Sequence, residues 1–177
     1  VVVIDDSIVR GTTLRESIVR MLSRLEPKKV IIVSSAPQIR YPDCYGIDMS
    51  KMNDFIAFQA AIALVKEQKQ DHLLDELYAR CQELLRTDQL HTENVVKRLY
   101  KPFTAEQISK KIAQLITPQD VNMDIEVIYQ TIEDLHSSCP TNTGDWYFTG
   151  DYPTKGGNRT VNRAFVNFYE GRKVRAY

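Results

Sequence analysis

Two short apolar runs flank a longer amphipathic stretch at the start of the chain. Residues 1–4 are apolar and β-branched, and residues 30–33 repeat that composition. Runs of this kind are typical of strands that are covered on both faces of a parallel sheet. Between the two runs, apolar residues recur at helical spacing, at Leu14, Ile18, Met21, Leu22 and Leu25. The pattern therefore predicts a strand–loop–helix–strand unit, whose right-handed crossover makes the two strands parallel.

The start of the predicted helix carries a signal of its own. Thr13 is followed three residues later by Glu16, which is the pairing of a capping box. Pro27 lies just past the last apolar position of this stretch. We therefore expect a helix that begins after Thr13 and ends before Pro27, with a loop over residues 5–12.

Beyond residue 53 the apolar positions take on helical spacing. This spacing predicts helices over residues 55–64, 73–85, 106–115 and 126–135, with Asp124 as the cap of the last, and a final helix over residues 162–170. The sequence accordingly predicts an α/β fold. We expect part of a doubly wound parallel sheet in residues 1–49, a helical region in residues 50–136, and a loop-rich C-terminal segment in residues 137–177.

Composition and charge narrow the classes of protein. The 177 residues are 43% hydrophobic and 26% charged, which is ordinary for a globular domain. Lys plus Arg and Asp plus Glu both number 23, a balance that favours neither nucleic acid nor an anionic membrane as partner. No apolar run approaches the roughly 20 residues of a membrane-spanning helix. Sparse cysteines favour a reducing cytoplasm, and a chain that begins with Val1 inside a strand-like run is expected to be a piece of a longer protein.

The loop after the first predicted strand carries the clearest chemistry. Its residues are Asp5, Asp6, Ser7, Ile8, Val9, Arg10, Gly11, Thr12 and Thr13. Ligands of open α/β sheets bind at the C-terminal ends of strands, and helix N-termini bind phosphate through free backbone N–H groups. Gly11 allows the backbone to approach an anion closely, and the hydroxyls add donors. The segment therefore predicts a phosphate-binding loop.

Two adjacent acids beside a phosphate cradle require an explanation, because they repel the same anion. A ribose supplies one: its neighbouring hydroxyls can donate to Asp5 and Asp6 while its 5′-phosphate lies on the loop. The carboxylates would also favour positive charge that develops on the ribose ring during catalysis. The alternatives are that the two acids only cap a turn or that they hold Mg²⁺.

The segment resembles the phosphoribosyl-pyrophosphate (PRPP) signature of type I phosphoribosyltransferases, and within them the amidophosphoribosyltransferase form. Two further stretches are similar to that family. The first is Ser34-Ser35-Ala36-Pro37-Gln38-Ile39-Arg40-Tyr41-Pro42 followed by Tyr45-Gly46-Ile47-Asp48-Met49, and the second is Tyr147-Phe148-Thr149-Gly150-Asp151-Tyr152-Pro153-Thr154. The close resemblance covers residues 1–49, and a weaker one covers residues 144–154.

The resemblance implies a function and roles for the site residues. Asp5 and Asp6 would be the catalytic acids that hold the ribose hydroxyls, and residues 7–13 would wrap the 5′-phosphate. The family joins ammonia, released from glutamine in an N-terminal domain, to C1 of PRPP, which gives 5-phosphoribosylamine and pyrophosphate in the first committed step of purine synthesis. Mg²⁺ accompanies the pyrophosphate, and binding of Mg²⁺ by Asp5 and Asp6 is a further expectation. Purine nucleotides inhibit these enzymes, which form homo-oligomers.

The chain also departs from the family. It lacks the glutaminase domain, the upstream strands, the pyrophosphate loop and the flexible lid, so we expect these 177 residues alone to be inactive. Some members bind an iron–sulfur cluster through C-terminal cysteines. Here Cys44 is displaced by one position, Cys139 lies too early, and Thr141 and Gly144 stand where cysteines are expected. Because such clusters need four ligands, we expect none, and we interpret Cys81 and the other cysteines as packing residues.

Other features and alternatives remain open. Residues 66–104 make a longer helical stretch than the family has, which we interpret as a core or subunit face. His72, His91 and His136 lack metal-ligand spacing, and the basic end over residues 159–177 is interpreted as a solvated or subunit-contacting tail.

One alternative function is another type I phosphoribosyltransferase, and a second is a non-catalytic PRPP-sensing regulator. No basic helix-turn-helix pattern supports the regulator.

Overall fold

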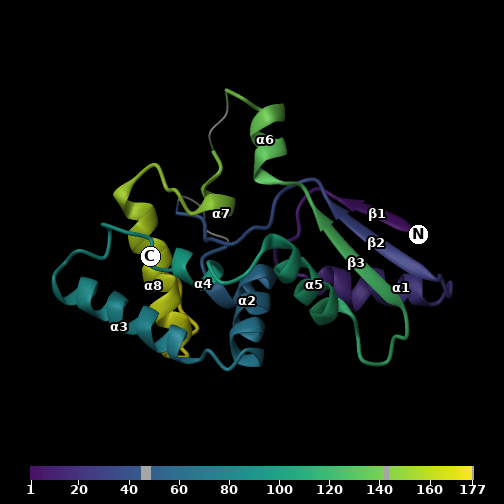
Figure 1. Cartoon of the computed structure of the whole chain (residues 1–177), viewed down its shortest axis with the longest axis horizontal. Helices are drawn as coiled ribbons and strands as arrows, with labels where there is room; N and C mark the ends of the chain where they lie inside the picture. Colours follow the sequence, from purple (N-terminus) through teal and green to yellow (C-terminus); the bar gives the residue numbers. More distant parts are fainter. Residues whose placement is uncertain (45–48, 142–143, 177) are drawn as a thin grey trace.

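A three-stranded parallel sheet lies at one side of the molecule (Figure 1). The computed structural model describes residues 1–44, 49–141 and 144–176. The strands are β1 (Val2–Asp5), β2 (Lys29–Ser34) and β3 (Asp124–Tyr129), in the order β1-β2-β3. Both neighbouring pairs are parallel. The predicted α/β fold and the parallel pairing of the first two strands are confirmed.

The helix between β1 and β2 does not begin as the sequence predicted. Thr13 itself has helical dihedral angles, φ −61° and ψ −42°, and its side chain makes no capping hydrogen bond. The expected capping box with Glu16 is therefore wrong. The helix continues as a π-helical segment, η1 (Leu14–Val19), which runs directly into α1 (Arg20–Ser23).

The π-helical segment changes which residues face the core. Leu14 and Val19, five positions apart, are both buried, as i→i+5 geometry requires. The extra residue turns every later side chain by about 100° relative to an α-helix. As a result Met21 is 60% exposed, and Leu25, which lies beyond the end of α1, is 70% exposed, although the sequence predicted both on the apolar stripe.

The fourth predicted helix, residues 126–135, is wrong in its first half. That part is β3, whose Val127 lies opposite Ile32 of β2 and is buried. β-Branched and aromatic residues fit a pleated surface, and exposed positions here alternate with covered ones along the strand. The helix α6 (Ile132–Ser138) starts only after β3, and its N-cap is Thr131, whose side chain accepts from the Asp134 amide at 3.0 Å. Asp124 opens the strand instead of capping a helix.

The remaining helices follow the sequence pattern more closely. The predictions for residues 55–64, 73–85 and 106–115 are confirmed, whereas the last helix begins seven positions earlier than residue 162. Thr104 and Gln107 form a capping box that the sequence analysis did not identify. The elements are η2 (Met52–Asp54), α2 (Ile56–Glu67), α3 (His72–Arg86), α4 (Lys97–Tyr100), α5 (Ala105–Ile116), α7 (Trp146–Thr149) and α8 (Lys155–Tyr169).

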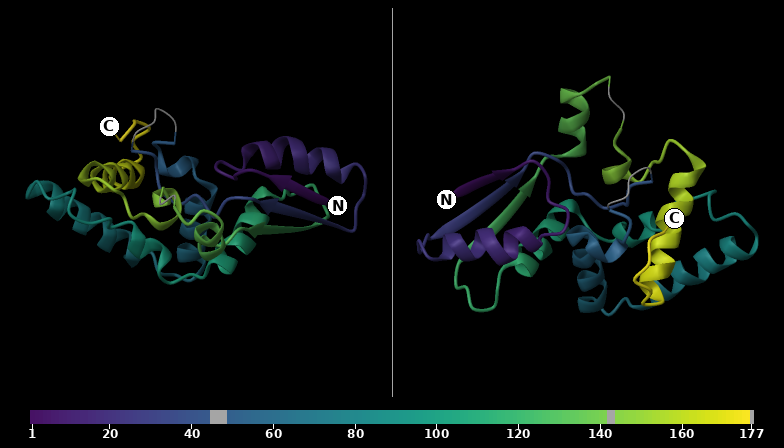
Figure 2. Two further views of the ribbon diagram at one scale, coloured as in Figure 1. Left: turned by 90° about the horizontal axis from the view of Figure 1, so that it is seen from above. Right: turned by 180° about the vertical axis from the view of Figure 1, so that it is seen from behind.

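The helix α5 connects the sheet with the helical part of the molecule. It packs against β3 and the π-helical segment on one side and against α2 on the other. Beyond α2, α3 packs along α8, and the two lie at the far end from the sheet (Figure 2). The core of the helical part contains Phe55, Phe58 and Phe165, each fully buried. Within the described ranges, no helix combines the length and the apolar character needed to cross a membrane.

Only one face of the sheet is covered by helices. Val30 and Ile32 point to this face and are fully buried, whereas Val2 and Ile4 on the opposite face of β1 are 61% and 75% exposed. Right-handed crossovers that step in the same direction across a sheet place their helices on the same face. In agreement, the strands are unobstructed in Figure 1, and α1 lies on the near side in the view from behind in Figure 2. The prediction that β1 is buried on both faces is therefore wrong.

Candidate functional site

The predicted loop follows β1 at the C-terminal edge of the sheet. β1 ends at Asp5, and the Ser7 amide donates to Asp6 Oδ1 at 2.9 Å. The carbonyl oxygen of Asp5 accepts from the amide of Ser35 at 2.9 Å and from its hydroxyl at 3.1 Å. These bonds tie the end of β1 to the end of β2, so the two carboxylates project from a fixed edge.

A cavity of about 460 Å³ lies within this loop. All the predicted site residues except Asp6 line it, together with two residues that the sequence analysis did not assign, Leu14 and Met49. The structure therefore brings the predicted segment around one concave surface. Asp6 is exposed beside the cavity rather than in its lining.

Buried anchors hold the shape of the loop. Ile8 is 3% exposed and Leu14 is 2% exposed, so both side chains point into the core and not toward a ligand. The carbonyl oxygen of Val9 accepts from the amide of Ile56 at 2.8 Å, which ties the loop to the start of α2. Ile8 and Val9 can therefore serve a ligand through their backbone only.

Gly11 occupies the tightest point of the loop. Its φ is +70°, and a Cβ atom there would lie 3.1 Å from Ile56 and 3.3 Å from Ile116. Both the dihedral angle and the close neighbours require glycine. Its carbonyl oxygen accepts from the Arg15 amide at 2.9 Å, which closes the first turn of the helix.

The loop ends at a helix N-terminus that carries exposed hydroxyls. Thr12 and Thr13 already belong to the helix, and both are exposed. The first amides of a helix have no acceptor within it, and the helix dipole makes this end positive. An anion above the loop would therefore meet backbone donors and two hydroxyls. Arg10 contributes less, because it is half exposed and its Nε lies 3.9 Å from Asp54 Oδ2.

The two acids influence each other. Desolvation raises the pKa of Asp5 above its usual value, and the hydrogen bond and negative charge of Asp6 raise it further. Such a carboxylate releases its proton less readily than a solvated aspartate. It is well suited to accept hydrogen bonds from neutral hydroxyl groups, and a nearby positive charge would stabilise its ionised form.

The structure adds a residue to this edge that the sequence analysis missed. Tyr129 lies opposite Ser34, and Ser34 lies opposite Asp5, so the three stand in one row across the sheet. Burial, followed by the charge of Asp5, raises the pKa of Tyr129. The residue was missed because its segment was predicted to be helical. A turn signal at residues 130–131 would have been needed to find it.

Metal ligands are few among the described residues. Across residues 1–44, 49–141 and 144–176, no group of three or more His, Cys, Asp or Glu side chains could hold a metal ion. Asp5 and Asp6 offer two carboxylates, which fits Mg²⁺ only when a ligand such as a phosphate supplies further oxygens. Cys81 is buried in α3, and burial raises the pKa of its thiol to about 12.

The two stretches that resembled one family lie against each other. The amides of Arg40 and Tyr41 both donate to the carbonyl oxygen of Tyr147, at 2.8 Å and 3.1 Å. The hydroxyl of Tyr152 donates to the carbonyl oxygen of Pro42 at 2.6 Å. The C-terminal stretch therefore braces the segment that follows β2. The intervening Tyr45-Gly46-Ile47-Asp48 lies outside the described residues.

Comparison with known proteins finds amidophosphoribosyltransferases. The chain is 53% identical over 58 residues to that of Pasteurella multocida and 51% identical over 57 residues to that of Escherichia coli. Each match covers about a third of the chain, 33% and 32%, and 11% of the relative. The Saccharomyces cerevisiae protein is 30% identical over 158 residues, which cover 87% of the chain.

The chain spans only part of these relatives. Its matches cover between 11% of the Pasteurella protein and 20% of the Saccharomyces protein. No family model matches the chain. No solved structure matches it either.

Proposed function

The chain is related by sequence to the C-terminal part of amidophosphoribosyltransferases, and on this premise we propose that residues 5–13 bind the ribose 5-phosphate end of PRPP. One observation carries the proposal. The structure places a positive-φ glycine, exposed threonine hydroxyls and a helix N-terminus around one cavity that begins at Asp5, with Asp6 exposed beside it.

In this proposal the roles divide along the loop. Asp5 and Asp6 accept hydrogen bonds from the two ribose hydroxyls, and the carboxylates stabilise positive charge that develops on the ring at the transition state. The backbone from Ser7 to Gly11 and the hydroxyls of Thr12 and Thr13 receive the 5′-phosphate. Because the anchors of the loop are buried, the donors stay in place without a ligand, which reduces the cost of ordering them.

Mg²⁺ belongs to the proposal as a partner of the substrate. The ion would be held by pyrophosphate oxygens and by Asp5 or Asp6, since it keeps few protein ligands. Bound there, it would neutralise charge on the leaving pyrophosphate. The chain's own contribution is to orient the ribose so that C1 faces the nucleophile.

The activity of the whole protein follows as a further part of the proposal. It would transfer ammonia derived from glutamine to C1 of PRPP, and so form 5-phosphoribosylamine and pyrophosphate in purine synthesis. The glutaminase would be a separate N-terminal domain, purine nucleotides would inhibit, and the enzyme would be a cytoplasmic homo-oligomer. We propose no iron–sulfur cluster, because such clusters usually need four ligands and the sequence has 3 cysteines.

Turnover tests the proposal. We expect the full-length protein to release pyrophosphate from PRPP when ammonium and Mg²⁺ are present, and the 177-residue chain alone to release none. Replacing Asp6→Asn should abolish most of the activity. The matched control is Asp88→Asn, the same change at a side chain that is 94% exposed. Full activity of the Asp6 variant would overturn the assignment of the loop.

A further inference from the structure

A second cavity opens beside the C-terminal end of β3, on the other side of the segment that follows β2. Its volume is about 700 Å³. We call it the Arg40 cavity, after the residues of its lining that matter here: Gln38, Arg40, Ser109 and Tyr129. These come from the segment after β2, from α5 and from the end of β3, so the cavity exists only in the folded chain.

The guanidinium of Arg40 is held in one orientation. Its Nε and Nη2 donate to Gln38 Oε1 at 3.1 Å and 2.7 Å, and it lies over the ring of Tyr100, 5.1 Å from the ring centre. Gln38 is itself 4% exposed, and its Nε2 donates to the Ala105 carbonyl at 2.7 Å and to the Ser109 hydroxyl at 2.9 Å. The side chain of Gln38, which orients Arg40, therefore has hydrogen bonds at both its oxygen and its nitrogen.

This arrangement leaves one edge of the guanidinium unused. A guanidinium has five N–H donors, and Gln38 takes the edge formed by Nε and one Nη2 proton. The edge formed by Nη1 and the second Nη2 proton matches the two oxygens of a carboxylate or phosphate. Among the described residues, no Asp or Glu lies within ion-pair distance of Arg40.

Tyr129 supplies a second donor in the same cavity. Its hydroxyl oxygen is buried and has no hydrogen-bond partner within the described part of the chain. Burial of a hydroxyl without a partner is unfavourable, and most such groups in proteins are satisfied. An unsatisfied hydroxyl and an unused guanidinium edge thus line the same cavity, and both are donors that an oxyanion could accept from.

The carboxylates nearby do not already fill this role. Glu106 is paired with Lys110 at 2.9 Å, and Glu126 is paired with Lys29 at 2.6 Å. The exposed Glu133 remains among the lining residues, and its negative charge disfavours a ligand with several anionic groups. The charge balance therefore suits a single oxyanion group.

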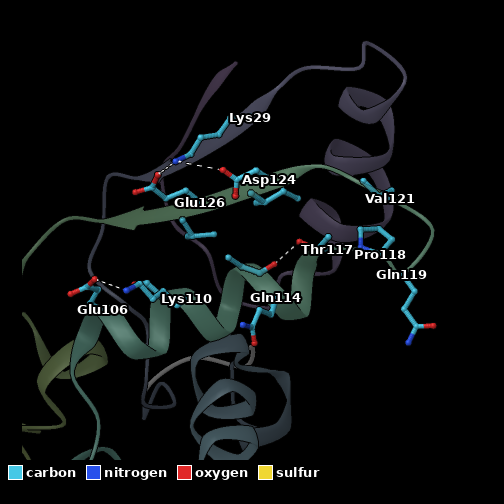
Figure 3. Close-up of a pocket in the computed structure, with 14 residues that line it drawn as sticks. Lys29, Glu106, Lys110, Gln114, Thr117, Pro118, Gln119, Val121, Asp124 and Glu126 are labelled. Atoms are coloured by element: carbon cyan, nitrogen blue, oxygen red, sulfur yellow. Dashed lines mark hydrogen bonds and ion pairs between the residues drawn. The ribbon is translucent and has the colours of Figure 1, made fainter.

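The neighbouring cavity shows the contrast. It has a volume of about 760 Å³ and lies between β3 and α5 (Figure 3). Its lysines are both engaged, since Lys29 lies 3.7 Å from Asp124 and 2.6 Å from Glu126, and Lys110 pairs with Glu106. With both lysines paired to carboxylates, the lining of this cavity has no unused positive charge to offer an anion.

We propose that the Arg40 cavity binds a small molecule through one carboxylate or phosphate monoester group, which accepts two hydrogen bonds from Arg40 and a third from Tyr129. The inference goes beyond the PRPP loop and does not require it. The two sites lie on the same edge of the sheet but share no lining residue.

The test is a titration of the full-length protein with acetate and, separately, with methyl phosphate. The signal of isotope-labelled Tyr129, assigned with Tyr129→Phe, reports binding at this cavity, and the titration contains no PRPP. Because a hydrogen-bonded charged group contributes about 1.5–3 kcal/mol, Arg40→Gln should weaken binding roughly tenfold to a hundredfold. Arg40→Lys, which keeps the charge and most of the stem, should weaken it as well, since the fork is lost. In unlabelled protein, calorimetry should show that Tyr129→Phe lowers the affinity for the oxyanion by roughly twofold to tenfold.

Controls separate this site from its surroundings. Lys66→Gln removes an exposed cation of α2 that does not line the Arg40 cavity, and should leave the affinity unchanged. The double variant Thr12→Val and Thr13→Val should weaken PRPP binding. It should not affect the change in the Tyr129 signal that acetate or methyl phosphate causes. The two probes distinguish a carboxylate ligand from a phosphate ligand. If neither probe shifts the Tyr129 signal, or if Arg40→Gln and Arg40→Lys both bind as the unaltered protein does, the proposal is overturned.

Discussion

The two cavities at the C-terminal edge of the sheet are built in opposite ways. The PRPP loop comes from one continuous stretch, and its shape depends on backbone conformation and buried anchors. The Arg40 cavity joins segments that are up to 96 positions apart, from Pro37 to Glu133, and the orientation of its guanidinium depends on the side chain of Gln38. The difference teaches that a continuous site can be recognised in a sequence, whereas an assembled site becomes visible only after folding.

The largest expected effect falls on the acids of the continuous site. Asp5→Asn and Asp6→Asn each remove an ionised acceptor for a ribose hydroxyl, so each should lower PRPP turnover by roughly tenfold to a hundredfold. Asp6→Asn should not alter oxyanion binding at the Arg40 cavity, whereas Asp5→Asn removes a charge that acts on Tyr129. Steady-state kinetics and the Tyr129 titration on the same preparations check both statements. Equal losses at the two cavities would mean that they are not separate sites.

The backbone of the loop predicts a second effect. Gly11→Ala forces a side chain into the left-handed region, which costs about 1–2 kcal/mol, and also places it against Ile56 and Ile116. Gly171→Ala is the matched control, because its φ is +69° and nothing lies within 4 Å of the added Cβ. Chemical denaturation should therefore show a greater loss of unfolding free energy for Gly11→Ala. A greater loss for Gly171→Ala would contradict the close packing of the loop.

The side-chain support of the assembled site predicts an effect of similar or smaller size. Gln38→Leu removes the acceptor of Arg40 and two donors to α5, and should lower the free energy of unfolding by about 1–3 kcal/mol. It should also weaken oxyanion binding, since Arg40 loses its fixed orientation. PRPP affinity should stay the same. Loss of PRPP affinity without loss of stability would link the two sites instead.

The smallest effect concerns pH. PRPP binding needs the ionised form of Asp5, whose pKa is raised by desolvation and by Asp6. As the pH is lowered, PRPP affinity should therefore fall. The midpoint of this fall should lie at a higher pH than it would if Asp5 were an ordinary solvated aspartate. Asp6→Asn removes the negative neighbour, so the remaining fall should move to lower pH. Calorimetric titrations at a series of pH values check the direction, and a shift to higher pH in the variant would contradict the coupling.

The same pKa shift has a consequence for folding. Because Asp5 is harder to ionise in the folded state than in the unfolded chain, its contribution to stability is present below the unfolded pKa and is lost as the pH rises through the folded pKa. The pH dependence of stability from this residue thus runs opposite to that of binding. Measuring both on one sample separates the two.

The parts of the fold that the sequence predicted are those with one clear periodicity. The β-branched runs at residues 1–4 and 30–33 became paired parallel strands, and the helices near residues 55, 73 and 106 formed as expected. The predicted start of the first helix was wrong, because Thr13 lies within the helix. No residue type signals the π-helical turn. The helix predicted over residues 126–135, with Asp124 as its cap, was wrong in its first half. The apolar positions there suit a strand and a helix equally well, and pairing with β2 selects the strand.

The candidate sites repeat that lesson. Asp5, Gly11 and Thr12 could be assigned from the chain alone, because adjacent residues must share a loop. Arg40 and Tyr129 could not, because nothing in their separation indicates that they line one cavity. Arg40 lay in a recognised stretch without a role, and Tyr129 lay in a segment predicted as the wrong element.

Amide hydrogen exchange of the full-length protein, with and without PRPP and Mg²⁺, tests the central claim most directly. The account predicts that PRPP slows exchange in the peptides that cover residues 5–13, that this protection is lost in Asp6→Asn, and that the peptides that cover residues 129–133 are unaffected. Protection that appears elsewhere while residues 5–13 exchange as before would contradict the assignment of this loop as the PRPP site.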